Sequence, residues 1–168
     1  MVRKTIVMVI AVTAVIAFVV SVFFTSLPRG GEIPELVIHL DQDKCNRCGM
    51  LISDVRFAAA MFVEGELDFR KYDDIGCMLA EYITLDKDRI MEVIVHDYVS
   101  GEAVKVEEAW FVVAPRDKLV TPMGYGVAAF KNLEDAEQVA GEYGGEVMKW
   151  EGLVDKARHI LGEAIPHA

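Results

Sequence analysis

The chain is 168 residues long and carries a formal net charge of −10, with 27 acidic and 17 basic residues. Arg3 and Lys4 are the only charges before residue 25, so the remainder has 15 basic and 27 acidic residues and a formal charge of −12. Such an acidic surface argues against nucleic acid and anionic lipid headgroups as partners. The length suffices for one membrane segment and one globular domain.

Residues 5–24 form an apolar run without a single charge. Twenty residues at about 1.5 Å each span roughly 30 Å, the hydrocarbon thickness of a bilayer. The run is longer than a signal-peptide core, and no clear cleavage site or lipid-accepting cysteine follows it. We expect residues 1–25 to be an uncleaved anchor, with a cytoplasmic amino terminus and an extracytoplasmic remainder. Residues 26–42, rich in proline and glycine at their start, are the predicted linker.

The remainder, residues 43–168, is predicted to be one α+β domain. An edge strand is expected at 35–40, just before it. Inside it we expect a buried strand at 56–63, a turn at 64–66 and a hairpin partner at 67–70. Asp73 or Asp74 caps a helix with one apolar stripe, and a strand follows at 91–95.

The second half of this domain has the same order of elements. Strands are predicted at 110–114 and 126–130, with a helix that Asn132 caps and Asp135 supports. Gly144 ends this helix, and a strand at 147–150 and a helix at 154–163 follow. Residues 69–82 align with residues 130–143 without a gap, and Phe, Asp, Glu and Tyr coincide. We therefore predict duplicated ββαβ units, about 43–103 and 104–152, plus a C-terminal helix.

The densest group of sulfur atoms lies in residues 43–52, where Cys45 and Cys48 form a Cys-x-x-Cys motif and Met50 follows. Thiolates and thioethers are soft ligands that favour Cu(I). A disulfide or a redox pair would use only the two cysteines and leave Met50 without a role. The residues themselves leave metal binding, thiol–disulfide chemistry and a structural bridge open.

Other sulfur and imidazole groups could join this site. Cys77 lies one position off the apolar stripe of its helix, so we expect its side chain at the helix edge. Met123 is placed in a loop, where residues carry function more often than in regular elements. His39 and His96 could each donate an imidazole, although a satisfied histidine is the simpler interpretation. No nucleophilic triad or phosphate loop is evident, so the sequence does not indicate an enzyme.

Four motifs, in order over residues 44–150, resemble the NosL family. They are Cys48-Gly49-Met50, residues 72–78 (YDDIGCM), residues 122–130 (PMGYGVAAF) and residues 142–147 (EYGGEV) before Trp150. The resemblance implies a pair of ββαβ units, similar to part of an organomercurial lyase. It also implies a copper chaperone that delivers Cu(I) to nitrous-oxide reductase, or to its assembly complex at the membrane, in denitrification.

The resemblance further implies that Cys48, Met50 and Met123 are the copper ligands. Cys45 and Cys77 are further candidates, since many members lack the first of these. A second departure is the membrane segment, because typical members are lipoproteins.

Two alternatives to the copper chaperone remain. One is a membrane-anchored thiol–disulfide reductant that uses Cys45 and Cys48. The other is a structural zinc domain, in which a histidine such as His96 joins Cys45, Cys48 and Cys77.

Overall fold

The protein is described by a computed structural model, which defines residues 15–16 and 33–162. The contacts divide the chain into one unit of residues 1–32 and a second of residues 33–168. The predicted membrane anchor therefore lies outside the described residues, apart from positions 15 and 16. Among the residues that are described, no helix has the length and apolar character needed to cross a bilayer.

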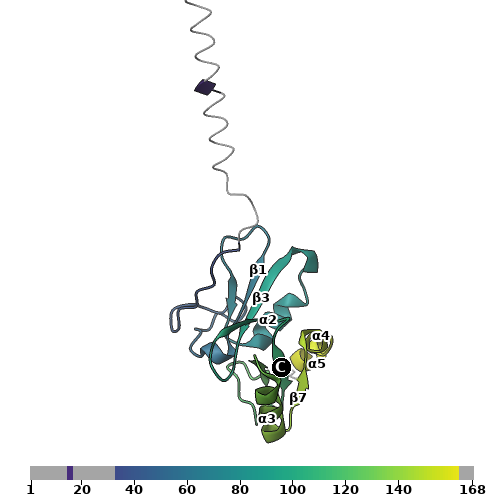
Figure 1. The fold of residues 1–168 in the computed structure, drawn as a ribbon. Coiled ribbons are helices and arrows are strands. Elements are labelled where there is room, and N and C mark those ends of the chain that lie inside the picture. The colour runs from purple at the N-terminus through teal and green to yellow at the C-terminus, as the bar shows by residue number, and fades with distance from the viewer. Residues whose placement is uncertain (1–14, 17–32, 163–168) are drawn as a thin grey trace, which may run out of the picture. The chain divides into compact units, whose positions relative to one another are not determined.

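The first sheet has four antiparallel strands in the order β2-β1-β3-β4. Its two inner strands, β1 and β3, lie side by side (Figure 1). Its strands are β1 (Ala59–Val63), β2 (Arg70–Tyr72), β3 (Ile90–His96) and β4 (Ala103–Lys105). Every residue of the inner strand β1 is buried, as its apolar run predicts. Helix α2 (Ile75–Tyr82) packs on β1 and β2. The short 3-10 helices η1 (Val55–Phe57) and η2 (Lys87–Arg89) precede β1 and β3.

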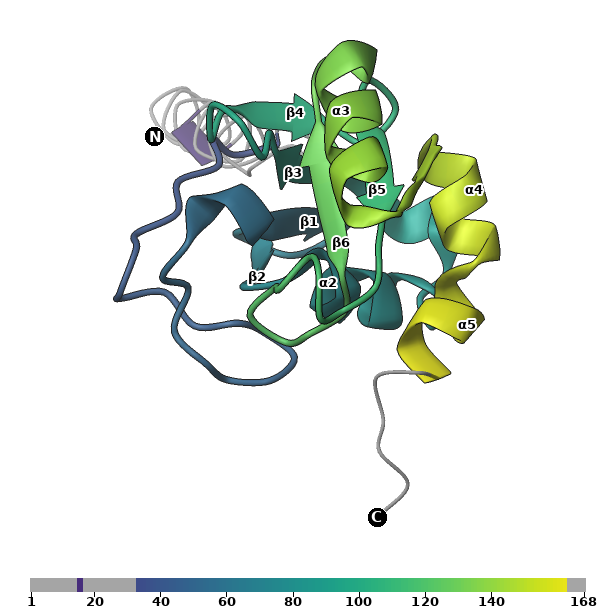
Figure 2. The same cartoon turned by 90° about the horizontal axis from the view of Figure 1, so that it is seen from below.

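The second sheet has three antiparallel strands in the order β6-β5-β7. Its strands are β5 (Trp110–Val113), β6 (Val127–Phe130) and β7 (Glu146–Met148). Helix α3 (Leu133–Tyr143) packs across all three strands, and the short helices α4 (Trp150–Asp155) and α5 (Ala157–Gly162) lie to one side (Figure 2). Helix α5 also contacts α2, which joins the two halves of the domain.

The two sheets meet where β3 ends. Asp97 forms a parallel bridge with Ala129 of β6, and the Tyr98 N–H donates to the Ala129 carbonyl at 2.8 Å. The Asp97 side chain accepts from the Lys131 N–H at 2.9 Å. The largest cluster of buried apolar side chains contains residues from β1, β3, β5, β6, α2, α4 and α5. The two sheets thus share one core.

The predicted fold class is confirmed in its main feature, a mixed fold with helices on antiparallel sheets. Both halves run strand, strand, helix, strand, and in both sheets the first of these strands lies between the other two. That both halves arose by duplication stays a prediction.

Several predicted boundaries are wrong. Residues 35–40 form no strand, because their backbone pairs with no other strand. The side chain of Leu36, together with Ile33, packs against the buried cluster that contains Phe62 and Phe69. The partner of β1 is residues 70–72, not 67–70, because the turn extends past Leu67, which is 96% exposed.

Three further predictions, two on helices and one on a strand, also need correction. Asn132 occupies the N-cap of α3, but its side chain donates to Asp135 instead of capping the backbone. The predicted strand at 147–150 ends at Met148, since Trp150 begins α4 and buries its ring against Phe111 and Tyr82. The predicted terminal helix is divided into α4 and α5.

Candidate metal centre

Cys45 and Cys48 lie in a tight hairpin. Lys44 and Leu51 pair across its base, and the Cys45 N–H donates to the Met50 carbonyl at 2.8 Å. The Gly49 N–H donates back to the Cys45 carbonyl at 2.9 Å, and Gly49 has a φ of 75°, a left-handed conformation that glycine adopts without strain. No helix follows the two cysteines directly.

Helix α2 presents the third cysteine to this hairpin. Asp74 is the N-cap, and its Oδ1 accepts from the Gly76 N–H at 2.8 Å, which satisfies one of the free donors of the first turn. Cys77 follows and is only 1% exposed. The expectation that Cys77 lies at the helix edge is therefore wrong. The helix has no open edge there, because every residue from 75 to 80 is buried.

Three thiols and one carboxylate converge between the hairpin and α2. The Sγ atoms of the cysteines and one carboxylate oxygen lie within 4.8 Å of one another; the residues are Cys45, Cys48, Cys77 and Asp73. We call this group the cysteine cluster. All three cysteines are free thiols. The Cys48 thiol donates to Asp73 Oδ1 at 3.4 Å.

Burial differs among the members of the cysteine cluster. Cys45 and Asp73 are each 2% exposed, whereas Cys48 is partly exposed. Asp73 Oδ2 is buried and has no hydrogen-bond partner. The sequence places both Asp73 and Asp74 at the start of a helix, with one of them as its cap. A helix cap needs only one of two adjacent aspartates. The second carboxylate was therefore the sequence signal that Asp73 could have another role.

The cysteine cluster favours one thiolate, at Cys45. The Cys77 thiol donates a hydrogen bond to it, which lowers the pKa of Cys45 to about 4 against the opposing effect of burial. The same hydrogen bond raises the pKa of Cys77. Burial raises the pKa of Cys48 to about 11 and that of Asp73 to about 6, and the neighbouring Cys45 contributes to both. A cation near Cys45 would draw further protons off the cluster.

The loop that carries Met123 is tied to the residue next to the cluster. Asp74 Oδ2 accepts from the Thr121 hydroxyl at 2.6 Å and from the Met123 N–H at 2.9 Å. The Thr121 hydroxyl oxygen in turn accepts from the Tyr125 N–H at 3.0 Å. Asp73 therefore faces the cysteines while its neighbour holds the Met123 loop. The tertiary structure brings two distant motifs to the start of one helix.

Tyr125 adds a second link between this loop and the cysteine hairpin. Its ring lies against α2 at Gly76, where a Cβ atom would be 2.1 Å from the Tyr125 Cγ. Burial raises the pKa of Tyr125, and a side-chain hydrogen bond with Arg47 opposes that rise. Arg47 stands between Cys45 and Cys48, so the Met123 loop and the cysteine hairpin contact each other.

The two predicted methionine ligands lie at the border of this region. Met50 is 50% exposed and shares the hairpin with Cys45 and Cys48. Met123 is partly buried against the main core. Their assignment as ligands stays a prediction.

His39 and His96 do not belong to the cysteine cluster. His96 is 6% exposed, and its Nδ1 lies 2.9 Å from the Ala58 carbonyl oxygen. His39 is exposed and interacts with Asp43 of its own turn. The zinc alternative therefore finds its fourth donor in Asp73 and not in His96.

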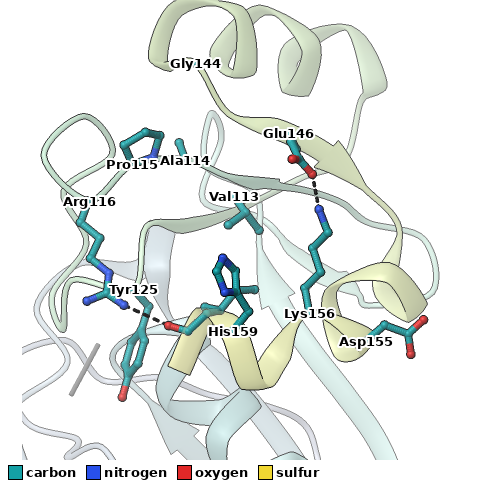
Figure 3. A pocket seen from close by; sticks show the side chains of 11 residues that line it. Val113, Ala114, Pro115, Arg116, Tyr125, Gly144, Glu146, Asp155, Lys156 and His159 are labelled. Atoms are coloured by element: carbon teal, nitrogen blue, oxygen red, sulfur yellow. Dashed lines mark hydrogen bonds and ion pairs between the residues drawn. The ribbon is translucent and has the colours of Figure 1, made fainter. Parts of the chain in front are cut away.

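A pocket of about 590 Å³ lies beside the second sheet (Figure 3). Lys156 forms an ion pair with Glu146 across it, and Arg116 donates to the Ile160 carbonyl at 3.0 Å. Tyr125 contributes to its wall, but none of the cysteine cluster residues does. The pocket is therefore distinct from the candidate metal centre.

Comparison with known proteins identifies similar sequences and folds. A family model described as NosL matches residues 37–157. The copper-binding lipoprotein NosL of Stutzerimonas stutzeri is 29% identical over 140 residues, which are 77% of this chain and 70% of that protein. The crystal structure of the copper chaperone NosL from Shewanella denitrificans matches with a TM-score of 0.57 and 22% identity, over 70% of this chain and 95% of that one. The structural match establishes a shared fold.

Proposed function

Because the chain belongs to the NosL family, we propose that it is a copper chaperone that binds Cu(I) and passes it to a copper enzyme. The resemblance read from the four sequence motifs is thereby confirmed. The relative from Stutzerimonas stutzeri is named as copper-binding, and the similar solved structure is named as a copper chaperone. A free-thiol cluster among the described residues supports metal binding by this chain as well.

The proposed copper ligands are Cys48, Met50 and Met123. The observation that carries this assignment is the arrangement of the two loops: Cys48 and Met50 share one hairpin, and Asp74 ties the Met123 loop to the same helix start. Cys48 is the least buried of the three thiols, and Met50 is half exposed. The ligands thus lie where an incoming protein could reach the ion.

The donor set also suits transfer. One thiolate and two neutral thioethers match the soft character of Cu(I) and compensate its single charge. A thioether is a weaker donor than a thiolate, so a thiolate or imidazole from a partner could replace the exposed Met50 first. Cys45, as the preferred thiolate nearby, is an additional donor available during exchange.

We propose that the domain works outside the cytoplasm, held by an anchor in residues 1–25, and that nitrous-oxide reductase or its assembly complex receives the copper. The acidic composition suits a partner with a basic docking surface. The protein is then a metallochaperone and not an enzyme.

The test is an anaerobic Cu(I) titration of the full-length chain in detergent against a chromogenic Cu(I) chelator. We expect one tight equivalent, loss of tight binding in Cys48→Ala, and at least tenfold weaker binding in Met50→Ala and Met123→Ala. Met91→Ala is the matched control, because Met91 is 45% exposed, close to the 50% of Met50, but lies on β3. Equal affinity in all four variants would contradict the ligand assignment.

Transfer is tested by mixing the copper-loaded chain with copper-free nitrous-oxide reductase and following the visible bands of its copper centres. The proposed role requires that the bands develop faster than with an equal amount of chelated Cu(I). Equal rates would leave a copper-binding protein without the proposed delivery.

A thiol–disulfide reductant is the second candidate function, because the low pKa of Cys45 is what that chemistry needs. The 2% exposure of Cys45 opposes it, since a partner disulfide must reach the attacking thiolate. This candidate gains support if Cys45→Ala abolishes reduction of a test disulfide while Met50→Ala and Met123→Ala leave it unchanged.

A further inference from the structure

We propose that the cysteine cluster is a second metal position, in which Cys45, Cys48, Cys77 and Asp73 bind Zn²⁺ with four ligands. The Cu(I) position proposed above uses a different donor set and shares only Cys48 with it. The zinc position does not depend on the copper function. It would stand even if this chain bound no copper.

The spacing of the donors fits one ion. Tetrahedral Zn²⁺ with sulfur at about 2.3 Å places its sulfur ligands about 3.8 Å apart. In the structure the four donor atoms lie within 4.8 Å of one another, so a small contraction completes the shell. Four donors without an open position are typical of a structural zinc site, whereas a catalytic site keeps one position for water.

The buried carboxylate of Asp73 favours zinc over Cu(I) as the bound ion. Its side chain is 2% exposed, and Oδ2 has no hydrogen-bond partner although it is buried. Buried carboxylate oxygens are almost always satisfied, so this one calls for a donor or a cation. An oxygen ligand suits the borderline Zn²⁺ ion, whereas Cu(I) prefers an all-sulfur environment.

The scaffold already holds these donors in place. The Asn46 N–H donates to the Lys71 carbonyl at 2.8 Å, which fastens the cysteine hairpin to β2. Asp74 fixes the start of α2 and with it the positions of Asp73 and Cys77. A zinc ion here would tie the hairpin to the helix and stabilise both.

Because Cys48 belongs to both donor sets, the two ions cannot both be fully coordinated in one chain. Copper loading would withdraw Cys48 from the zinc shell and leave Cys45, Cys77 and Asp73 for a weaker three-donor contact. We therefore expect Cu(I) and Zn²⁺ to compete, which gives the proposal a direct readout.

The experiment uses the full-length, reduced chain in detergent, titrated anaerobically with Co²⁺ as a visible probe and then with Zn²⁺. We expect one equivalent of Co²⁺ with thiolate charge-transfer bands and the visible bands of a tetrahedral ion, and displacement by Zn²⁺. Asp73→Asn and Cys77→Ser should weaken Zn²⁺ binding at least tenfold and change Cu(I) affinity less than threefold. Met50→Ala and Met123→Ala should do the reverse.

Three results would overturn the proposal. One is a Co²⁺ spectrum of the wild type without thiolate bands. Another is a loss of Cu(I) affinity in Asp73→Asn or Cys77→Ser as large as in Met50→Ala, which would make the cluster part of one copper site. The third is a Co²⁺ complex that excess Zn²⁺ fails to displace, which is seen as visible bands that persist. The first and third need no buried substitution, so they decide the matter if a variant fails to fold.

Discussion

Helices α2 and α3 occupy the same place in the two halves, but they differ in nearly every respect that matters for chemistry. In α2 all residues from 75 to 80 are buried, and the N-cap side chain bonds to the helix backbone. In α3 only Ala136 and Ala140 are buried, and the N-cap side chain makes no such bond. The first helix is therefore enclosed and carries the candidate metal centre, while the second covers a sheet.

The difference teaches that the same order of elements can serve two purposes. A helix with one buried face needs only an apolar stripe. A helix covered on all sides can hold a free thiol such as Cys77 away from water, beside the hairpin that supplies the other two thiols, and burial there shifts the pKa values of these groups. Substitutions of the N-cap and of a glycine in each of α2 and α3 test this comparison.

The largest effect is expected from removing the N-cap of α2. Asp74→Ala deletes a helix cap and leaves the Thr121 hydroxyl and the Met123 N–H without their shared acceptor. We expect a loss of about 3 kcal/mol in the free energy of unfolding. Urea unfolding of the metal-free, reduced protein measures it.

Asn132→Ala is the matched control in α3, since its side chain caps nothing. It should cost less than about 0.5 kcal/mol, because surface substitutions away from specific contacts have small effects. Similar losses in both variants would show that the two helix starts are equivalent after all.

The next effect concerns a glycine in each helix. Gly76→Ala places a Cβ atom against the Tyr125 ring, which must move, and we expect a loss of about 2 kcal/mol from overpacking. Gly141→Ala in α3 meets no atom within 4 Å and should stabilise by about 0.5–1 kcal/mol, since alanine favours a helix. A lower melting temperature for Gly76→Ala and a higher one for Gly141→Ala would support the comparison. Changes of the same sign in both variants would refute it.

The smallest effect is a pH dependence in the first half. Burial lowers the pKa of His96 at the end of β3, although the Ala58 carbonyl partly opposes this. The folded state thus prefers the neutral ring, so its contribution is complete above the unfolded pKa of about 6.5 and is lost as the pH falls toward the lower folded pKa. The slope for one group is at most about 1.4 kcal/mol per pH unit.

The measurement is urea unfolding between pH 7.5 and 5.5, for the wild type and for His96→Asn. The difference between the two curves isolates His96 from other groups that titrate in the same range, such as Asp73 with its pKa of about 6. The wild type should lose more stability toward acid than the variant. Parallel curves would mean that His96 does not contribute.

Local sequence patterns were sufficient for most of the fold. The continuous apolar run at β1, the Asp before α2 and the Gly after α3 predicted those elements, because burial on both faces, capping and left-handed termination are local requirements. The strand expected at 35–40 was wrong, since a strand exists only where another strand offers its backbone.

In the candidate site, too, local patterns were visible in the sequence and contacts between distant segments were not. The motif at Cys45 and Cys48 was evident from spacing, as was Met50. Cys77 was misplaced because its exposure depends on what covers the far side of α2. Asp73 was missed because the sequence shows that one of two adjacent aspartates is not needed as the cap, but not which one it is or what it contacts.

The sequence by itself determined the class of elements, the sulfur-rich segment at residues 43–52 and membership of the NosL family. Only the tertiary structure decided which donors converge, since Cys45 and Cys48 come from the hairpin and Asp73 and Cys77 from the start of α2. The physical reason is that periodicity and capping act over a few residues. The closeness of three thiols and a carboxylate is set instead by packing between a hairpin and a helix far from it in the chain.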